Sequence, residues 1–214
     1  MNKVFRHLVL VPFMVLVLFL GVTSSSASAQ NSYFGIQAGA VLLSDADIEQ
    51  SGLTAETSFD TGYLIGLTLG QKFDQFRLEG ELSYRSNSVS DISLFGVSVP
   101  ADGDTTSTSL MINGYYDIKT GSSVTPYLGA GIGFSQVSIN DLSVDGERVA
   151  DDDDIVFAYQ LAAGIAFNIN PSITLDLGYK YFATSDPSFN DVTGFPFDAE
   201  YSSHNFTVGM RFNF

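Results

Sequence analysis

The chain has 214 residues, contains no Cys and no Trp, and carries a formal charge of −15. The absence of Cys excludes a disulfide scaffold, thiolate catalysis and zinc–thiolate sites. A pI near 4.1 argues against a nucleic-acid partner, because the phosphate backbone would be repelled. Hydrophobic residues make up 45% of the chain and charged residues only 15%, which excludes a disordered acidic tail and favours one folded domain.

The first 29 residues have the layout of a cleaved secretory signal. Lys3 and Arg6 precede an apolar run over Leu8–Leu20, and Ala27-Ser28-Ala29 forms a small-x-small cleavage site. A transmembrane anchor, the alternative, requires about 20 apolar residues, and this run is shorter. We therefore predict a signal over residues 1–29 and a mature domain over residues 30–214. That domain would keep 7 Lys and Arg against 24 Asp and Glu, a charge of −17.

The rest of the chain alternates apolar and polar residues with a period of two, which is typical of β-strands. No later stretch is a continuous apolar helix candidate, so residence in a membrane would require strands. Each predicted strand is long enough to cross a bilayer when tilted. The pattern predicts eight strands, approximately over residues 32–42, 58–73, 75–88, 105–118, 124–137, 154–169, 172–182 and 201–214.

The alternation separates bulky apolar residues from small and charged ones. In the third predicted strand, Phe and Leu residues occupy one face, while Arg77, Glu79 and Glu81 occupy the other. Many glycines share the polar faces of the strands. A soluble lipocalin-like barrel would place the apolar face inside. The interior of an eight-stranded barrel is too narrow for so many rings and suits glycine, so we expect the apolar face to point outward.

Aromatic residues gather near the strand ends in two sets, as expected at the two interfaces of a membrane. One set is Phe34, Phe73, Phe76, Tyr116, Phe167, Phe212 and Phe214, and the other is Phe59, Tyr63, Tyr84, Phe157, Tyr159, Tyr179 and Tyr181. The links at Asp74, Lys119–Ser123 and Asn170–Pro171 are short, whereas those near 43–57, 89–104, 138–153 and 183–200 are long. We therefore predict an all-β fold, an eight-stranded antiparallel up-and-down transmembrane β-barrel with both termini in the periplasm.

Three segments resemble a known family. The segment over residues 126–134, PYLGAGIGF, is similar to the fifth strand of small OmpA-like barrels of the porin family. The segment over residues 158–182 resembles their sixth-to-seventh-strand hairpin, which also occurs in rickettsial-type surface antigens. The last strand ends in Phe214, like the C-terminal signal that the barrel assembly machinery reads. The resemblance implies a bacterial outer-membrane location, surrounding lipid and that machinery as a partner, but little about activity, because the family is functionally mixed.

The charged residues of the polar faces form one group. Its members are Arg77, Glu79, Glu81, Arg85, Asp176, Lys180 and Arg211, with Asn113, Asp117 and Gln160 placed nearby by strand parity. Unpaired charges in a narrow lumen are costly, so we expect a network of ion pairs. Two functions remain open for this network: a structural plug that holds the strand register, or a gated ion path that opens when the pairs rearrange.

Most of the acidic residues lie outside the predicted barrel core. Of the 24 acids, 18 fall within residues 43–57, 89–104, 138–154 and 183–200, and Asp151–Asp154 is the densest run. Carboxylates in flexible loops can bind calcium or magnesium, but this run lacks the spacing of an EF-hand. We expect a solvated acidic surface, in which affinity for a surface or host ligand would reside, and binding of divalent cations by Asp151–Asp154 stays open.

Enzymatic chemistry has little support in the sequence. His204 is the only histidine after the signal, and its parity places it on the lipid-facing side. Ser202 shares that face, which leaves a lipid-modifying enzyme as an alternative, but no acidic partner is identifiable. We predict a monomeric, non-enzymatic surface protein without cofactor or metal, which contributes to envelope integrity and exposes acidic loops. A narrow porin-like channel for ions or small solutes is the alternative of another class.

Overall fold

The computed structural model describes residues 31–44, 46–50, 53–94, 97–144, 147–190 and 196–214. The predicted signal over residues 1–29 lies outside them, as do the side chains of Phe59 and Asp151. Within the described residues, no helix is both long enough and apolar enough to cross a membrane.

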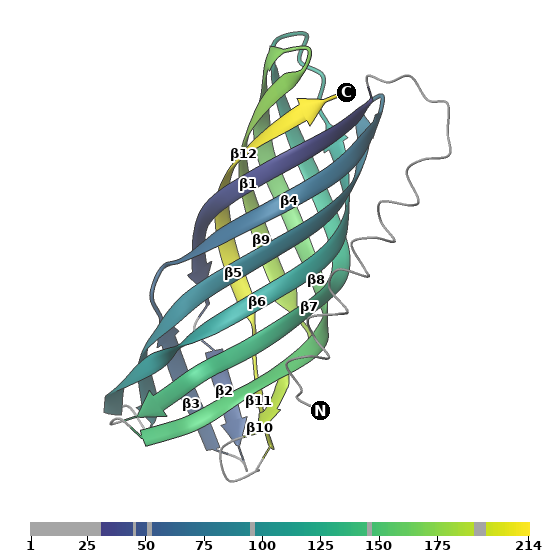
Figure 1. Ribbon diagram of the computed structural model, residues 1–214. Helices are drawn as coiled ribbons and strands as arrows, with labels where there is room; N and C mark the ends of the chain where they lie inside the picture. Colours follow the sequence, from purple (N-terminus) through teal and green to yellow (C-terminus); the bar gives the residue numbers. More distant parts are fainter. Residues whose placement is uncertain (1–30, 45, 51–52, 95–96, 145–146, 191–195) are drawn as a thin grey trace.

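Eight long strands form a closed antiparallel barrel. They are β1 (Ser32–Leu43), β4 (Gly62–Phe73), β5 (Phe76–Leu94), β6 (Val97–Asp117), β7 (Val124–Val144), β8 (Glu147–Asn170), β9 (Ile173–Thr184) and β12 (Ser202–Asn213). The cylinder closes because β1 pairs with β12 on one side and β4 on the other. Figure 1 shows these strands winding around one axis with a common tilt. The predicted fold class is confirmed, and each long strand overlaps one of the predicted segments.

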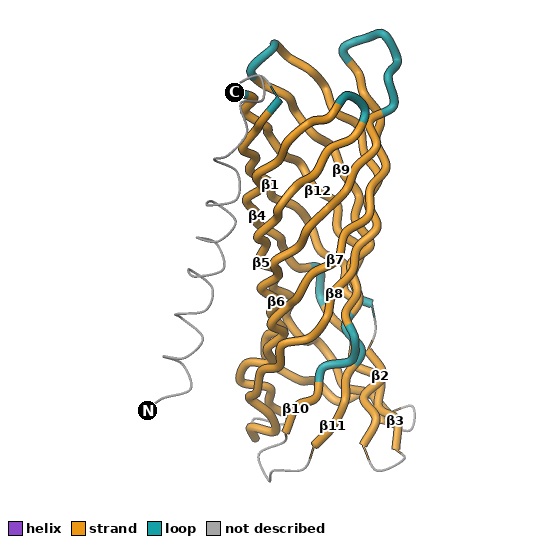
Figure 2. Tube along the Cα trace, turned by 90° about the vertical axis from the view of Figure 1, so that its right-hand side faces the viewer, coloured by secondary structure: helices purple, strands orange, loops and turns teal. Residues whose placement is uncertain are grey.

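The two ends of the barrel differ. At one end, which we name the turn end, short links join β4 to β5, β6 to β7 and β8 to β9, and the C-terminus lies there. At the other, the extended end, lie four shorter strands, β2 (Ala46–Gln50), β3 (Leu53–Phe59), β10 (Ser188–Asn190) and β11 (Pro196–Ala199). They continue the wall in the order β10-β11-β2-β3-β5 (Figures 1 and 2).

The expectation of long irregular links at the extended end was wrong for most of their length. β5 and β6 stay paired as far as Leu94 and Val97, and β7 and β8 as far as Val144 and Glu147. Pro100 and Gly103 belong to residue types that usually interrupt strands. Here they lie within β6, close to shifts in its register. A β-bulge accommodates such residues within a ladder, and Gly103 uses a φ of 148° that other residues rarely adopt. Breaker residues here bend the strands without ending them.

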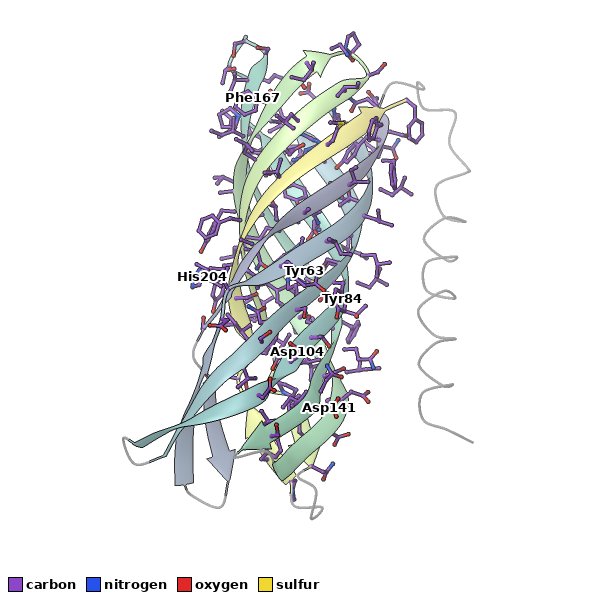
Figure 3. The ribbon with its side chains drawn as sticks, turned by 60° about the vertical axis from the view of Figure 1, so that its left-hand side comes forward. Tyr63, Tyr84, Asp104, Asp141, Phe167 and His204 are labelled. Atoms are coloured by element: carbon purple, nitrogen blue, oxygen red, sulfur yellow. The ribbon has the colours of Figure 1, made fainter. Side chains whose placement is uncertain are left out.

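The outer face of the barrel is apolar between two rings of aromatic side chains. Ile132 is 60% exposed and Leu128 58% exposed, and their neighbours on the same face are similar. Figure 3 shows Phe167 near the turn end and Tyr63, Tyr84 and His204 along the opposite boundary. A continuous exposed apolar belt of this kind is stable only when lipid covers it. The predicted outward orientation of the apolar face is therefore confirmed.

Aromatic rings also occupy the interior, where sequence reasoning expected glycines and charged residues. Tyr33, Tyr115 and Tyr127 are almost fully buried in the lumen. Each lies directly across the ladder from a glycine, in the pairs Tyr33↔Gly70, Tyr115↔Gly129 and Tyr127↔Gly164. The glycines leave the space that each ring fills. A Cβ atom added at Gly129 would lie 2.3 Å from the Tyr115 ring, and one added at Gly70 would lie 2.2 Å from that of Tyr33.

We expect Gly129→Ala to reduce the free energy of unfolding by about 1–3 kcal/mol, because the new methyl group must displace a packed ring. The matched control is Gly114→Ala on the outward face of β6, where an added Cβ meets nothing within 4 Å. Urea titration of refolded protein in vesicles, followed by far-UV circular dichroism, measures both variants. Equal midpoints for the two would contradict the packing of rings on glycines.

Candidate functional site: the barrel lumen

Near the turn end, the lumen is built around Arg77, which is 4% exposed. Its Nε donates to Asp117 Oδ1 at 2.9 Å, and its Nη1 donates to the Tyr33 hydroxyl at 3.1 Å. That hydroxyl donates to Glu79 Oε2 at 2.6 Å. The guanidinium also lies over the ring of Tyr115, 4.4 Å from its centroid. Two carboxylates and a ring thus compensate one buried cation.

A second ion pair lies beside the first. Arg211 Nε donates to Asp176 Oδ2 at 2.5 Å, and Arg211 Nη2 donates to Asp176 Oδ1 at 3.1 Å. This two-point geometry fixes the orientation of both side chains. The pair joins β9 to β12, next to the seam at which the barrel closes.

The middle of the lumen is centred on Glu81, whose side chain is fully buried. Lys180 Nζ lies 2.7 Å from Glu81 Oε2, and Asn113 Nδ2 donates to the same oxygen at 3.0 Å. Gln160 Nε2 reaches it at 3.2 Å and also donates to Asn113 Oδ1 at 2.6 Å. Four strands therefore converge on one carboxylate.

Arg85 departs from the expected pairing. Sequence reasoning expected it to take part in the network of ion pairs, but no described carboxylate forms an ion pair with it. Its Nε donates to Asn205 Oδ1 at 3.1 Å, and its Nη1 donates to the hydroxyls of Ser83 and Ser109 at 3.2 and 3.1 Å. The guanidinium stacks on Phe182, 3.9 Å from the ring centroid. Neutral acceptors and a ring surround this cation, which is fully buried.

Above Arg85, towards the extended end, the interior becomes apolar. A buried cluster fills this part of the barrel and consists of Val89, Met111, Val137, Ile139, Leu142, Val156, Ala158, Phe182, Phe189, Phe197 and Tyr201. Phe189 and Phe197 come from β10 and β11. Sequence reasoning missed this layer. The inward parity of Val137 and Val156 is the signal that could have found it.

Two residues of the acidic run join β10 to β8. Asp154 accepts the backbone N–H of Ile155 at 2.8 Å with one oxygen and that of Ser188 at 3.1 Å with the other. Asp152 bonds Asp153 and Asn190 in the same way, each at 3.0 Å. Each carboxylate thus links N–H groups of two strands. These two residues therefore hold β10 against β8, a structural role that the expected solvated acidic surface does not include. Among the described residues, no group of three or more acidic or histidine side chains could hold a metal ion.

His204 lies on the outer face, as its parity predicts. Its Nδ1 is 2.8 Å from the Tyr179 hydroxyl, and its ring lies against Tyr179 and Tyr181. Its hydrogen-bond partner is therefore a phenol, and Ser202, which shares the face of His204, is half-buried at the first position of β12. This arrangement is an aromatic cluster at the membrane boundary.

The model of the outer membrane protein β-barrel domain matches residues 15–214. The chain belongs to this family. It is therefore a bacterial outer-membrane protein, and its wall is embedded in lipid. A Rickettsia bellii protein named "Putative adhesin" is 27% identical over 206 residues, which cover 85% of this chain and 87% of that protein. Outer membrane protein PagN of Salmonella typhimurium is 26% identical over 172 residues, covering 70% of this chain and 72% of PagN.

Solved structures show the same fold. The crystal structure of Neisserial surface protein A superposes with a TM-score of 0.53 at 21% identity and covers 85% of this chain and 97% of that chain. That of OprG from Pseudomonas aeruginosa gives a TM-score of 0.56 at 18% identity, over 86% and 98% of the two chains. At these identities the likeness concerns the barrel and not its function.

Proposed function

We propose that the protein is a plugged, non-enzymatic surface barrel, which strengthens the envelope and carries a binding surface outside the membrane. The observation that supports a plug is the filling of the lumen by consecutive layers. Ion pairs around Arg77 and Glu81 are followed by the Arg85–Phe182 stack and then by the apolar cluster. An ion would have to break several buried contacts in series to pass.

The extended end supports a role in binding. The paired strands β7 and β8 run roughly ten residues past the aromatic boundary. This stretch extends from Phe134 to Val144 in β7 and from Phe157 back to Glu147 in β8. At about 3.3 Å per residue and a tilt near 40°, they project roughly 25 Å, comparable to the height of the lipid belt. Asp104 and Asp141 are exposed on this projection (Figure 3). With the termini in the periplasm, the projection faces outside the cell and presents acids to cationic partner surfaces.

A truncation tests the binding role. Shortening the β5–β6 and β7–β8 hairpins by removing residues 89–104 and 138–153 should abolish attachment to host cells and leave a barrel that still migrates anomalously when unheated. The matched control changes a turn at the other end, by removing residues 120–122. Attachment that survives loss of both hairpins would contradict the proposal, as would loss of attachment in the control.

The proposed non-enzymatic role gives a separate prediction. We expect His204→Ala to leave the lipid A and phospholipid composition of the outer membrane unchanged, because the described partners of the imidazole are the rings of Tyr179 and Tyr181 and the Tyr179 hydroxyl. Mass spectrometry of lipids from cells with the wild-type protein, the variant or no protein makes the comparison. A lipid species that depends on His204 would contradict the proposal.

We further propose that the protein is a monomer and that the barrel assembly machinery recognises its last strand. Phe214 is 59% exposed at the turn end, and its backbone N–H bonds Ser32 O. The ring is therefore available on the outside of the barrel while the backbone completes the closing seam.

A further inference from the structure

A small cavity lies inside the lumen near the turn end. Its volume is about 40 Å³, and its lining includes Gln37, Arg77, Glu79, Asp176, Lys180 and Arg211. This volume accommodates roughly three waters, or one small ion. The cavity lies between the two ion pairs of Arg77 and Arg211, on the side of the lumen away from the apolar cluster.

Three donors of the lining have no hydrogen-bond partner in the protein: Gln37 Nε2, Arg77 Nη2 and Arg211 Nη1. The two arginines are 4% and 5% exposed, so bulk solvent does not satisfy them. The amide of Gln37 has a defined orientation, because Lys180 can only donate and contacts Gln37 Oε1 at 3.0 Å. Its NH₂ group must therefore point away from Lys180. Buried donors without acceptors are costly, and here three of them line one cavity.

Three carboxylate oxygens of the same lining already accept hydrogen bonds. Glu79 Oε2 accepts the Tyr33 hydroxyl, and both oxygens of Asp176 accept from Arg211. A cation in the cavity would find engaged carboxylates and unpartnered N–H groups. An anion would find the donors that it needs.

The charge balance of the lumen points the same way. Among the side chains that the structure describes, five of the chain's nine Lys and Arg residues face the lumen. They are Lys72, Arg77, Arg85, Lys180 and Arg211, and the described carboxylates that face them are Glu79, Glu81, Asp117 and Asp176. Between the turn end and the apolar cluster, and counting half-buried Lys72, these residues carry five positive charges against four negative ones, although the protein as a whole is strongly acidic. An excess charge in a low-dielectric interior attracts a counterion.

We propose that the cavity binds one small monovalent inorganic anion, with chloride as the fitting ion by size and charge. Arg77 Nη2, Arg211 Nη1 and Gln37 Nε2 donate to it, and its charge balances the interior. The anion completes the turn-end half of the plug and stabilises the closed barrel. This site is independent of any binding at the extended end, because the apolar cluster separates the two.

The test compares protein refolded in vesicles in sodium chloride and in sodium gluconate at equal ionic strength, since gluconate is too large for the cavity. We expect the melting temperature to rise with chloride and to saturate about 3–6 °C higher at concentrations well above Kd. Crystals grown in sodium bromide should show an anomalous peak within hydrogen-bond distance of Arg77 and Arg211. Equal melting temperatures in the two salts, together with ordered water only in the cavity, would overturn the proposal.

A conservative variant makes the test specific. Gln37→Glu keeps the oxygen that Lys180 contacts, replaces the free NH₂ group by an oxygen and adds the missing negative charge. We expect it to fold, to lose the chloride dependence and to lose the bromide peak. The control, Lys119→Gln, removes an exposed cation that pairs with Asp74 outside the lumen and should behave like the wild type. If Lys119→Gln loses the chloride response as well, the response is general screening, and the proposal fails.

Discussion

Replacing Lys180 with methionine is expected to lower the free energy of unfolding by about 3–5 kcal/mol, because it leaves the buried Glu81 carboxylate without its cation. Lys180 Nζ lies 2.7 Å from Glu81 Oε2, and the side chains of the two residues are 5% and 0% exposed. Methionine retains most of the aliphatic volume, so the expected loss is electrostatic. Urea titration in vesicles, followed by far-UV circular dichroism, measures it in a chain that has no Trp to report by fluorescence.

The double variant Lys180→Met/Glu81→Gln separates charge from packing. Neutral glutamine can still accept from Asn113, so we expect the double variant to recover most of the stability lost in the single one. The control is Lys119→Met at the turn end, where the Lys119–Asp74 pair is exposed and should be worth less than about 1 kcal/mol. A Lys180→Met variant no less stable than this control would contradict the assignment of Glu81 as the centre of the plug.

Phe182→Ala is the second change with a large expected effect, about 3–5 kcal/mol. The ring is fully buried, packs on the Arg85 guanidinium at 3.9 Å and belongs to the apolar cluster. Its removal leaves a cavity where the polar and apolar layers of the lumen meet and takes away the only ring that lies over Arg85 among the described contacts. The same urea titration measures the loss.

Phe206→Ala provides the matched control for this change. Phe206 lies on the outer face of the neighbouring strand β12 and is 52% exposed, so lipid chains can fill the space that its ring leaves. We expect its loss of stability to be less than half that of Phe182→Ala. If the order of the two variants is reversed, the lumen is loosely packed at Phe182, and the description of a continuous plug is wrong.

The strands and their faces could be predicted from the sequence because a period of two decides which side chains share a face. Arg77, Glu79 and Glu81 were assigned to one side of one strand by parity alone. Their partners could not be assigned in this way. The contact between Glu81 and Lys180 depends on the curvature of the closed wall, which brings residues of distant strands together across the lumen.

Two features of the lumen needed the structure. The inward glycines suggest open space for a pore, but Tyr33, Tyr115 and Tyr127 fill that space, because each ring lies across the ladder from a glycine. The apolar cluster was missed because Phe189 and Phe197 lie in a segment that reads as loop. Above the membrane the outer face of a strand meets water, so the alternation there no longer distinguishes a lipid side from a lumen side.

The most direct test of the closed lumen is planar-bilayer recording of the wild-type protein, refolded and purified to a single species, at neutral pH in 1 M potassium chloride. A closed lumen predicts a silent membrane under applied voltage, with no more current than lipid alone, although the protein is shown to be inserted by protection of its barrel from added protease. Reproducible conductance steps of one size, present with the wild-type protein and absent from a mock preparation, would contradict it.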